Sequence, residues 1–290
     1  MRSLLFVPAH DTRKLTRALD CAADALIIDL EDAVPEAEKA RARAMCAEFV
    51  KAHRARLRLF VRVNALSTGL TAADLEAVVS ARPYGIMLPK CESGRDVVTL
   101  HASISQLEAR HGMQDGSVRI LPIVTESAAA LFEMGSYAHA GTRLCAMMWG
   151  GEDLAADVGT VSNRSADGRY TAPYELARSL TLLGATAAQV PAIDAVYTNF
   201  RDAQGLQAEA AEAVRDGFSA KAAIHPDQIG PIHAAFTPSA VDLEWARRVI
   251  AAFDEKPGSG AVSIDGKMLD RPHYRAAQRL LVRAGSLHHP

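Results

Sequence analysis

Two acidic residues follow two consecutive apolar segments of the chain and could hold a metal ion. Glu126 follows RILPIVT (119–125), and Asp153 follows RLCAMMWG (143–150) after a Gly-Gly turn. Two carboxylates provide hard oxygen ligands and leave room for water and a bidentate substrate, which is typical of Mg²⁺ or Mn²⁺ sites. The alternative is that both residues cap the helices that follow them. Zinc is disfavoured, because no two histidines have a suitable spacing.

Three more acids, Asp29, Glu31 and Asp32, stand at the end of another apolar segment. Side-chain alternation places Asp29 and Glu31 on the same side of an extended chain. Charges there are costly to bury unless they meet cations, metal-bound water or solvent. We interpret Asp29 as an outer-shell group of the metal site. The alternative is an ion pair with Arg62 or Lys90.

Arg62 and Lys90 also end apolar segments, LFVRVN (59–64) and GIMLPK (85–90). An arginine that points into a site can bind a carboxylate or an enolate oxygen through two N–H groups. The alternative for Arg62 is a structural partnership with the acids at the end of the preceding segment. The position of Lys90 also suits a lysine that forms a Schiff base.

Basic residues gather after the first two apolar segments and could bind the phosphates of a ligand. The alternative is that they lie on solvated helix surfaces. They are Arg13, Lys14, Arg17, Lys39, Arg41 and Arg43.

The apolar segments that carry these polar residues recur along the whole chain. They are rich in aliphatic residues and lack strict alternation, which is typical of strands covered on both faces. Helical patterns lie between them, and Asp11 and Thr71 are expected to be helix N-caps. The predicted strands are 3–8, 25–30, 59–64, 85–90, 119–125, 143–150, 192–198 and 219–226.

Eight strands separated by helices predict an α/β fold, a (β/α)₈ TIM barrel. An open doubly wound sheet is the alternative, and the absence of a GxGxxG turn disfavours it. Active sites of such barrels lie at the carboxyl ends of the strands. The polar residues described above fall at these ends, and we expect no matching cluster at the opposite ends. We predict a catalytic barrel over residues 1–235 and a short C-terminal helical extension over 236–290 that acts as a lid.

Composition and charge exclude several classes of protein. The formal net charge of −2 offers no electrostatic basis for binding nucleic acid or an anionic membrane. No apolar run approaches the roughly 18–20 residues that span a bilayer. The four cysteines are scattered without metal-ligand spacing, so we expect reduced thiols and a cytoplasmic location.

The chain resembles the citrate lyase β-subunit family, which includes malyl-CoA and citramalyl-CoA lyases. The resemblance covers nearly the whole chain and departs from many relatives at the first turn, PAHD, where the CoA contacts are placed in doubt. It rests on FVPAHDTRKLTRAL, ALIIDLEDAV, VRVN, LPK, TES, GGEDLAADVG, KAAIHPDQI and GKMLDRP, in this order.

The resemblance implies a role for individual residues. Glu126 and Asp153 would be the Mg²⁺ ligands, with Asp29 in the outer shell. Arg62 would bind the thioester or oxoacid oxygen. Asp270 would be a catalytic acid on a lid that reaches the active site of a neighbouring subunit.

Other implied roles concern the substrate and the assembly. Gly151 and Glu152, in the GGEDL segment, would contact the substrate together with Arg62 and Glu126. The resemblance also implies a homo-oligomer, a trimer or hexamer that exchanges lids. The coenzyme A contacts would be Arg13, Lys14, Lys39, Ile224 and His225.

The predicted reaction is Mg²⁺-dependent cleavage or formation of the carbon–carbon bond of a 3-hydroxyacyl-CoA. Citryl-CoA, citramalyl-CoA and malyl-CoA are the candidates, and the products are acetyl-CoA and a 2-oxo acid. The alternatives are a metal-dependent aldolase acting on free 2-oxo acids such as pyruvate, a malyl-CoA thioesterase, and a lyase subunit whose substrate arrives on an acyl carrier protein.

Overall fold

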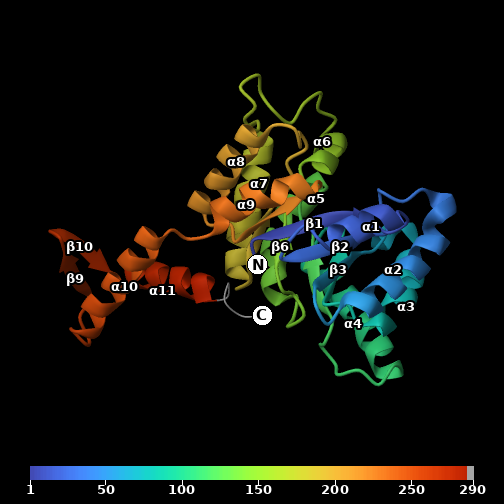
Figure 1. The fold of residues 1–290 in the computed structure, drawn as a ribbon, viewed down its shortest axis with the longest axis horizontal. Coiled ribbons are helices and arrows are strands. Elements are labelled where there is room, and N and C mark those ends of the chain that lie inside the picture. The colour runs from blue at the N-terminus through green and yellow to red at the C-terminus, as the bar shows by residue number, and fades with distance from the viewer. Residues whose placement is uncertain (286–290) are drawn as a thin grey trace.

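Residues 1–285, which the computed structural model describes, form a parallel barrel and a small C-terminal extension (Figure 1). Neighbouring strands follow the order β5-β4-β3-β2-β1-β8-β7-β6, and isolated parallel bridges (Ile120–Leu144 and Ile123–Met148) connect the two ends of this sheet. The prediction of a (β/α)₈ barrel is therefore confirmed. The strands are β1 (Ser3–Pro8), β2 (Ala25–Asp29), β3 (Arg58–Arg62), β4 (Gly85–Leu88), β5 (Arg119–Pro122), β6 (Met147–Met148), β7 (Ala192–Asp194) and β8 (Ala220–Ala223).

Helices surround the strands, and local capping interactions set where several of them begin. The Asp11 side chain accepts hydrogen bonds from the backbone N–H groups of Arg13 and Lys14, as predicted for an N-cap. The prediction for Thr71 is wrong, because this residue is already helical and its hydroxyl donates to loop carbonyls at Asn64 and Ala65. The barrel helices are α1 (Thr12–Ala18), α2 (Lys39–His53), α3 (Thr71–Val78), α4 (Gly94–Arg110), α5 (Ala128–Phe132), α6 (Glu152–Val158), α7 (Ala172–Ala187), α8 (Ala203–Asp216) and α9 (Ile229–Phe236).

The strands bury apolar side chains on both faces, which explains why they lack polar alternation in the sequence. Leu4, Ile27 and Phe60 belong to the cluster inside the barrel. Their neighbours Leu26 and Val61 belong to the larger cluster between the strands and the helices. Alternation along each strand thus fills two apolar layers. Most charged groups of the strands stand at the strand ends, whereas Lys221 within β8 is fully buried and pairs with Asp194 and Glu209.

One buried charge cluster lies at the amino-terminal ends of the strands, so the expectation of none there was wrong. Arg143, just before β6, donates to Glu108 of α4 through Nη1 (3.0 Å) and Nη2 (2.5 Å), and both side chains are fully buried. Arg143 also contacts Asp115 at 2.6 Å. The carboxylates come from a helix and a loop, so the strand sequences alone did not reveal them.

The C-terminal extension has an apolar core of its own. It consists of α10 (Ala240–Asp254), the hairpin of β9 (Ala261–Ile264) and β10 (Lys267–Asp270), and α11 (Arg271–Gly285). Buried residues of these elements form one cluster, and the extension projects from the barrel in Figure 1. The domain division at 235/236 remains a prediction, and residues 286–290 of the predicted extension lie outside the described residues.

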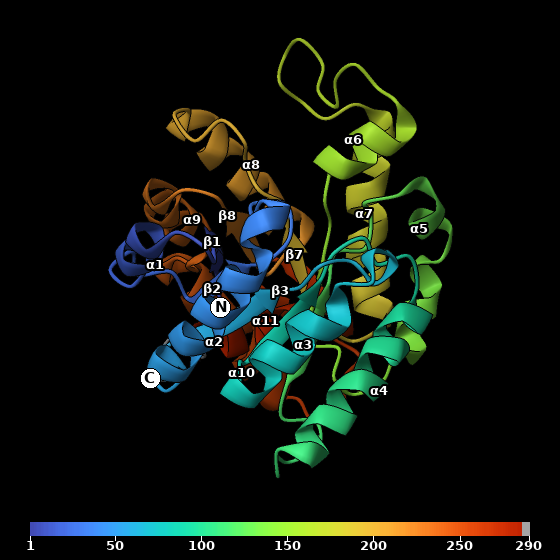
Figure 2. The same ribbon diagram turned by 90° about the vertical axis from the view of Figure 1, so that its right-hand side faces the viewer.

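A long loop joins α6 to α7. Figure 2 shows the segment between α6 and α7 extending well beyond the helices on either side of it. An Arg164–Tyr170 bridge joins the two sides of this loop. Within residues 1–285, no helix is both long enough and apolar enough to cross a membrane.

Candidate functional site

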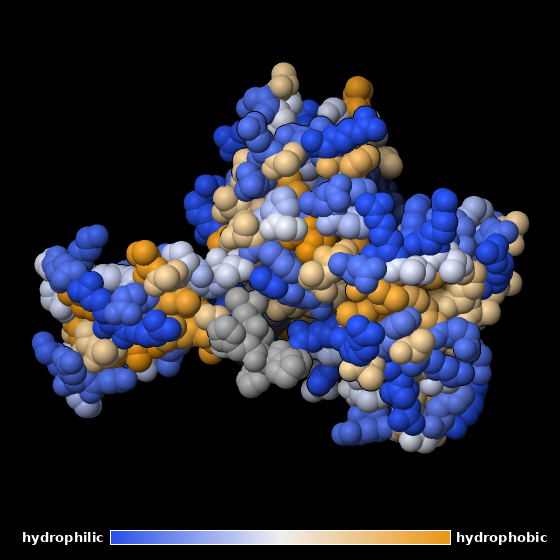
Figure 3. Space-filling view, viewed as in Figure 1, coloured by the Kyte–Doolittle hydropathy of each residue, from blue (hydrophilic) through white to orange (hydrophobic). Residues whose placement is uncertain are grey.

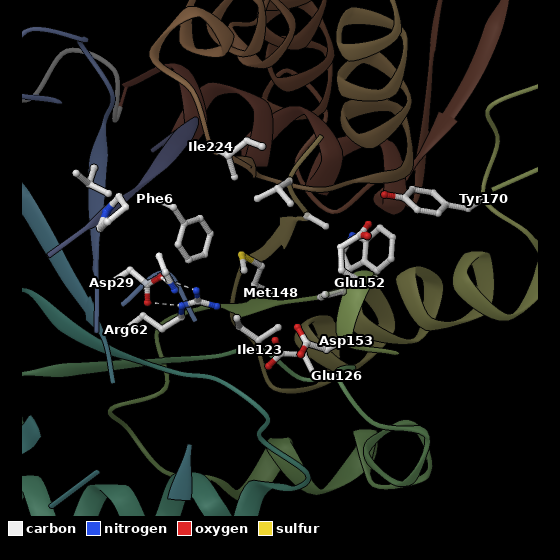
Figure 4. A pocket seen from close by; sticks show the side chains of 18 residues that line it. Phe6, Asp29, Arg62, Ile123, Glu126, Met148, Glu152, Asp153, Tyr170 and Ile224 are labelled. Atoms are coloured by element: carbon white, nitrogen blue, oxygen red, sulfur yellow. Dashed lines mark hydrogen bonds and ion pairs between the residues drawn. The ribbon is translucent and has the colours of Figure 1, made fainter. Parts of the chain in front are cut away.

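A cavity of about 330 Å³ lies at the carboxyl ends of the barrel strands. Asp29 and Arg62 line one side of it, and Glu126 and Asp153 line another (Figure 4). These four residues come from the ends of β2 and β3 and from the segments after β5 and β6. Parallel strands bring their carboxyl ends to one edge, so residues far apart in the sequence meet in one cavity.

Arg62 is held in one orientation by the acids of the neighbouring strand. Its Nε and Nη2 atoms donate to Asp29 Oδ1 and Oδ2 at 2.7 and 2.6 Å, and its Nη1 lies 3.0 Å from Glu31 Oε2. The guanidinium carbon also lies 5.0 Å from the centre of the Phe6 ring. Burial alone would lower the pKa of Arg62, but these carboxylates outweigh it and raise the pKa. Arg62 is therefore a fixed positive charge at the cavity wall.

Glu126 and Asp153 form the acidic side of the cavity, and their carboxylates lie beside each other in Figure 4. Burial, opposed in part by a hydrogen bond from the Lys90 backbone and reinforced by the charge of Asp153, raises the pKa of Glu126 to about 8. The Lys90 ammonium, 3.4 Å from Asp153, offsets only part of the negative charge of this pair, so the pair suits a divalent cation. Among residues 1–285, no three His, Cys, Asp or Glu side chains converge as a complete ligand set. The donors therefore fit Mg²⁺, which keeps several waters or substrate oxygens.

Lys90 connects the two sides of the cavity through its backbone and its side chain. It adopts a left-handed conformation (φ 49°), and its N–H donates to Glu126 Oε2. Its ammonium lies 2.5 Å from Glu31 and 3.4 Å from Asp153. Burial would lower the pKa of Lys90, but the bond to Glu31 and the surrounding negative charges raise it. A Schiff-base lysine needs a neutral amine, so this environment disfavours that role.

The segment after β6 lines the cavity with the predicted substrate contacts. Gly151 and Glu152 both face the cavity, and Glu152 accepts a hydrogen bond from Asn163 at 2.9 Å. At the opposite rim, Ile224 lines the cavity and is 40% exposed. The ring of His225 stacks on Phe200 with centroids 4.9 Å apart, outside the cavity lining.

The other predicted coenzyme A contacts lie near the same end of the barrel but do not line the cavity. Arg13 and Lys14 are exposed in the first turn of α1, which follows the carboxyl end of β1. The Lys39 ammonium donates to the carbonyls of Leu30 and Glu31 at 2.9 and 3.0 Å. These two hydrogen bonds hold Lys39 against the loop after β2, which carries Glu31 and Asp32.

Asp270 does not line the cavity of its own chain. It ends β10, in the part of the extension farthest from the barrel in Figure 1. Its carboxylate lies 2.6 Å from His273 Nδ1, and both side chains are about half exposed. Within one chain, the structure therefore does not bring Asp270 together with Arg62 and Glu126.

Sequence reasoning missed several aromatic and aliphatic residues of the cavity. Phe6 and Met148 lie on strands, where they were counted only as core, and alternation could have placed them on the inner face. Tyr170 comes from the loop between α6 and α7, which carries no strand signal. Its ring packs edge-on against Trp149 with centroids 4.9 Å apart. The Trp149 indole is anchored by a 2.7 Å hydrogen bond to Asp194.

Comparison with known proteins gives this site a family context. Residues 2–226 match the HpcH/HpaI aldolase/citrate lyase family. The mitochondrial citramalyl-CoA lyase of Rattus norvegicus is 33% identical, over 99% of this chain and 86% of the relative. A (3S)-malyl-CoA thioesterase of Cereibacter sphaeroides is 35% identical, over 99% of this chain and 95% of the relative.

A solved structure extends the likeness to three dimensions. The crystal structure of protein CitE from Mycobacterium tuberculosis, in complex with magnesium, acetoacetate and coenzyme A, is 36% identical. It superposes with a TM-score of 0.78 over 98% of both chains. With its eight-stranded barrel and the acids at the strand ends, this chain belongs to the HpcH/HpaI aldolase/citrate lyase family.

Proposed function

We propose that this chain is a Mg²⁺-dependent lyase that cleaves or forms the carbon–carbon bond of a 3-hydroxyacyl-CoA. The observation that carries the proposal is the placement of fixed Arg62 and the Glu126–Asp153 pair on two sides of one cavity. Cleavage of such a thioester develops negative charge on the oxygen of the substrate hydroxyl and on the oxygen of the thioester enolate. In this proposal Arg62 stabilises the enolate oxygen, and the cation site at Glu126 and Asp153 serves the hydroxyl oxygen.

Glu126 and Asp153 are the residues that would hold Mg²⁺, with Mn²⁺ as a possible substitute. Both are hard oxygen donors, and a divalent cation would stabilise the ionised form of Glu126, whose pKa is raised by burial and by the charge of Asp153. When bound, the ion supplies a Lewis acid for the hydroxyl and carboxylate oxygens of the substrate. Both carboxylate oxygens of Asp29 accept hydrogen bonds from Arg62, so Asp29 would orient the guanidinium from the outer shell of the metal site.

Arg62 is the group placed to stabilise the enolate. During cleavage a base takes the proton of the hydroxyl, a carbonyl forms at that carbon as its bond to the thioester α-carbon breaks, and the electron pair of the broken bond moves to the thioester as an enolate. A guanidinium has five N–H groups, and the contacts with Asp29 and Glu31 leave some of them for this oxygen. Because Asp29 already fixes the side chain, little reorganisation is needed when the charge develops.

The enolate carbon must gain a proton to become acetyl-CoA, and we assign this step to Asp270 of a neighbouring subunit. Asp270 stands on the extension and away from the cavity of its own chain. The extension also exposes apolar side chains, since Val241, Met268 and Val282 are 73–78% exposed. Figure 3 shows apolar surface interspersed with polar surface on the extension. Exposed apolar surface of this kind supports a homo-oligomer, a trimer or hexamer, in which lids are exchanged.

We propose that coenzyme A carries the acyl group of the substrate. Ile224 at the rim and the adjacent His225 would contact the pantetheine arm. Arg13 and Lys14 would attract the phosphates, with Lys39 nearby on the loop after β2. An acyl carrier protein carries the same arm, so it is the alternative donor of the substrate.

The deciding experiment is to incubate the purified chain with Mg²⁺ and citryl-, citramalyl- or malyl-CoA. Release of acetyl-CoA together with the matching 2-oxo acid, abolished by EDTA, is expected. Free CoA with an intact hydroxy acid would instead establish a thioesterase. Turnover of free 2-oxo acids alone would establish an aldolase, and activity only with an acylated carrier protein would establish a carrier-dependent subunit.

A further inference from the structure

Three apolar side chains of the cavity lining, Phe6, Ile123 and Met148, form a surface that we call the apolar floor. Ile123 and Met148 are 2% and 3% exposed and are bridge partners across the β5–β6 junction. All three belong to, or pack against, the cluster inside the barrel. In Figure 4, Ile123 and Met148 lie between Arg62 and the carboxylates of Glu126 and Asp153, and Phe6 lies beside Arg62. A substrate that contacts both Arg62 and the Glu126–Asp153 pair must therefore lie over the apolar floor.

The charges around the floor are predominantly negative. Asp29, Glu126, Glu152 and Asp153 line the cavity, and Arg62 is the single cation among its described lining residues. Arg62 is already paired with Asp29 and lies 3.0 Å from Glu31. The nearby ammonium of Lys90 is likewise surrounded by Glu31, Asp32 and Asp153. A second carboxylate on the substrate would find no free cation here.

Space beside the metal-binding carboxylates is also restricted. A β-carbon at Gly150 would stand 3.1 Å from both Glu126 Cγ and Ile123 Cγ2. The glycine thus lets the chain pass close to the floor. A side chain at position 150 would press against Ile123 and Glu126, so the backbone here already fills the space beside both residues. This corner suits a small substituent.

We infer that the site selects thioesters whose carbinol carbon carries a small uncharged substituent, with methyl preferred to hydrogen and carboxymethyl rejected. The inference rests on the proposed function. The hydroxyl and carboxylate of that carbon would face the cation that Glu126 and Asp153 would hold, and the thioester arm leads to Arg62. The remaining substituent then meets the apolar floor. A methyl group gains contact there, whereas a carboxylate loses its hydration without gaining a partner.

The preferred substrate class is therefore that of citramalyl-CoA, whose cleavage yields pyruvate. One methyl group in an apolar pocket changes kcat/KM by about tenfold or more, which sets the expected preference over malyl-CoA. The unpaired carboxylate should lower kcat/KM for citryl-CoA by at least about a hundredfold. Comparable values for citryl-CoA and citramalyl-CoA would overturn the inference.

A binding measurement separates the selectivity from the proposed reaction. Calorimetry with Mg²⁺ and freshly dissolved 2-oxo acids should give affinities in the order pyruvate, glyoxylate, oxaloacetate. Failure of every thioester to react would refute the proposed lyase, while this order of affinities would still support the selectivity. Oxaloacetate binding as tightly as pyruvate would refute the selectivity whatever the thioesters do.

A pair of variants tests the floor itself. Ile123→Ala should raise the affinity for 2-oxobutanoate relative to pyruvate by about tenfold, because room opens for an ethyl group. Val124→Ala is the matched control, since this neighbour is buried in the layer towards the helices and should leave the ratio unchanged. If Ile123→Ala does not fold, Ile123→Val removes one methyl group and should shift the ratio in the same direction. An unchanged ratio in the folded variant would exclude Ile123 from the floor.

Discussion

Asp29 and Arg62 are register partners on the adjacent strands β2 and β3, and their side chains form a two-point ion pair. Both donor–acceptor distances are below 2.8 Å, and both residues are largely buried. Strand pairing thus fixes the backbone under each partner, while the carboxylate fixes the plane of the guanidinium. The pair presents a rigid donor to the cavity instead of a mobile charge.

Arg62→Lys should lower kcat/KM of the lyase reaction by at least about a hundredfold, the scale for losing one donor to a developing oxyanion. Lysine keeps the charge but cannot make the two-point contact with Asp29. Steady-state kinetics checks this, and circular dichroism verifies folding. Arg56→Lys, at an exposed position, is the matched control and should retain full activity. Equal kinetics in both variants would remove Arg62 from the reaction.

Asp153→Ala should abolish measurable Mg²⁺ binding, because Glu126 is then left as the single carboxylate of the proposed ligand pair. Isothermal calorimetry measures this without any substrate. Asp157→Ala is the control, since Asp157 lies one turn further along α6 and accepts a hydrogen bond from the Ala128 N–H. Undiminished Mg²⁺ affinity in Asp153→Ala would contradict the metal site.

Asp270→Ala should lower turnover by at least about a hundredfold, the low end of general acid–base contributions. The loss should be in kcat, because a proton donor acts in the chemical step and contributes little to substrate binding. Asp254→Ala, an exposed acid at the end of α10, should be unaffected.

Subunit exchange gives a sharper test of the lid. Co-expression of Asp270→Ala with Arg62→Lys should yield mixed oligomers in which some sites combine an intact Arg62 with an intact Asp270. Their activity should exceed the sum of the two variants. Activity that never rises above this sum would show that the lid does not cross between subunits.

Glu108→Gln should destabilise the fold by about 3 kcal/mol at neutral pH, since it removes the buried carboxylate that pairs with Arg143 and leaves the exposed Asp115 as the remaining acid beside it. Burial alone would raise the pKa of Glu108, but hydrogen bonds from Arg143, Val118, Ser117 and Gly116 lower it to about 2. The stabilisation is therefore complete above the ordinary value of 4.5 and is lost as the pH falls towards 2.

Urea denaturation at several pH values tests this sign. The difference in unfolding free energy between the wild-type chain and Glu108→Gln should shrink from pH 5 towards pH 2. The exposed ion pair of Arg110 and Glu76 provides the control, because Glu76→Gln should cost less than about 1 kcal/mol. A difference that does not change with pH would mean that the Glu108 carboxylate is not held ionised by Arg143.

Much of the barrel could be predicted from the sequence. Strands buried on both faces need apolar residues at nearly every position, so segments such as ALIIDL and GIMLPK stand out without knowledge of their neighbours. The polar residues at their ends also stand out, because charges are rare beside such runs. Asp29, Arg62, Glu126 and Asp153 were therefore recognisable as members of one cavity.

Only the tertiary structure decided how these residues interact. The two-point pairing of Asp29 with Arg62 depends on strand register, and the contacts of Lys90 depend on a left-handed backbone at that residue. Glu108 meets Arg143 across 35 residues of chain, which no local pattern shows. In the sequence, Ile123 and Met148 are apolar like any other core residue. Only the packing of the folded barrel shows that they form the apolar floor of the cavity. Local sequence determines which face of a strand is apolar, but contacts between distant segments depend on how the barrel closes.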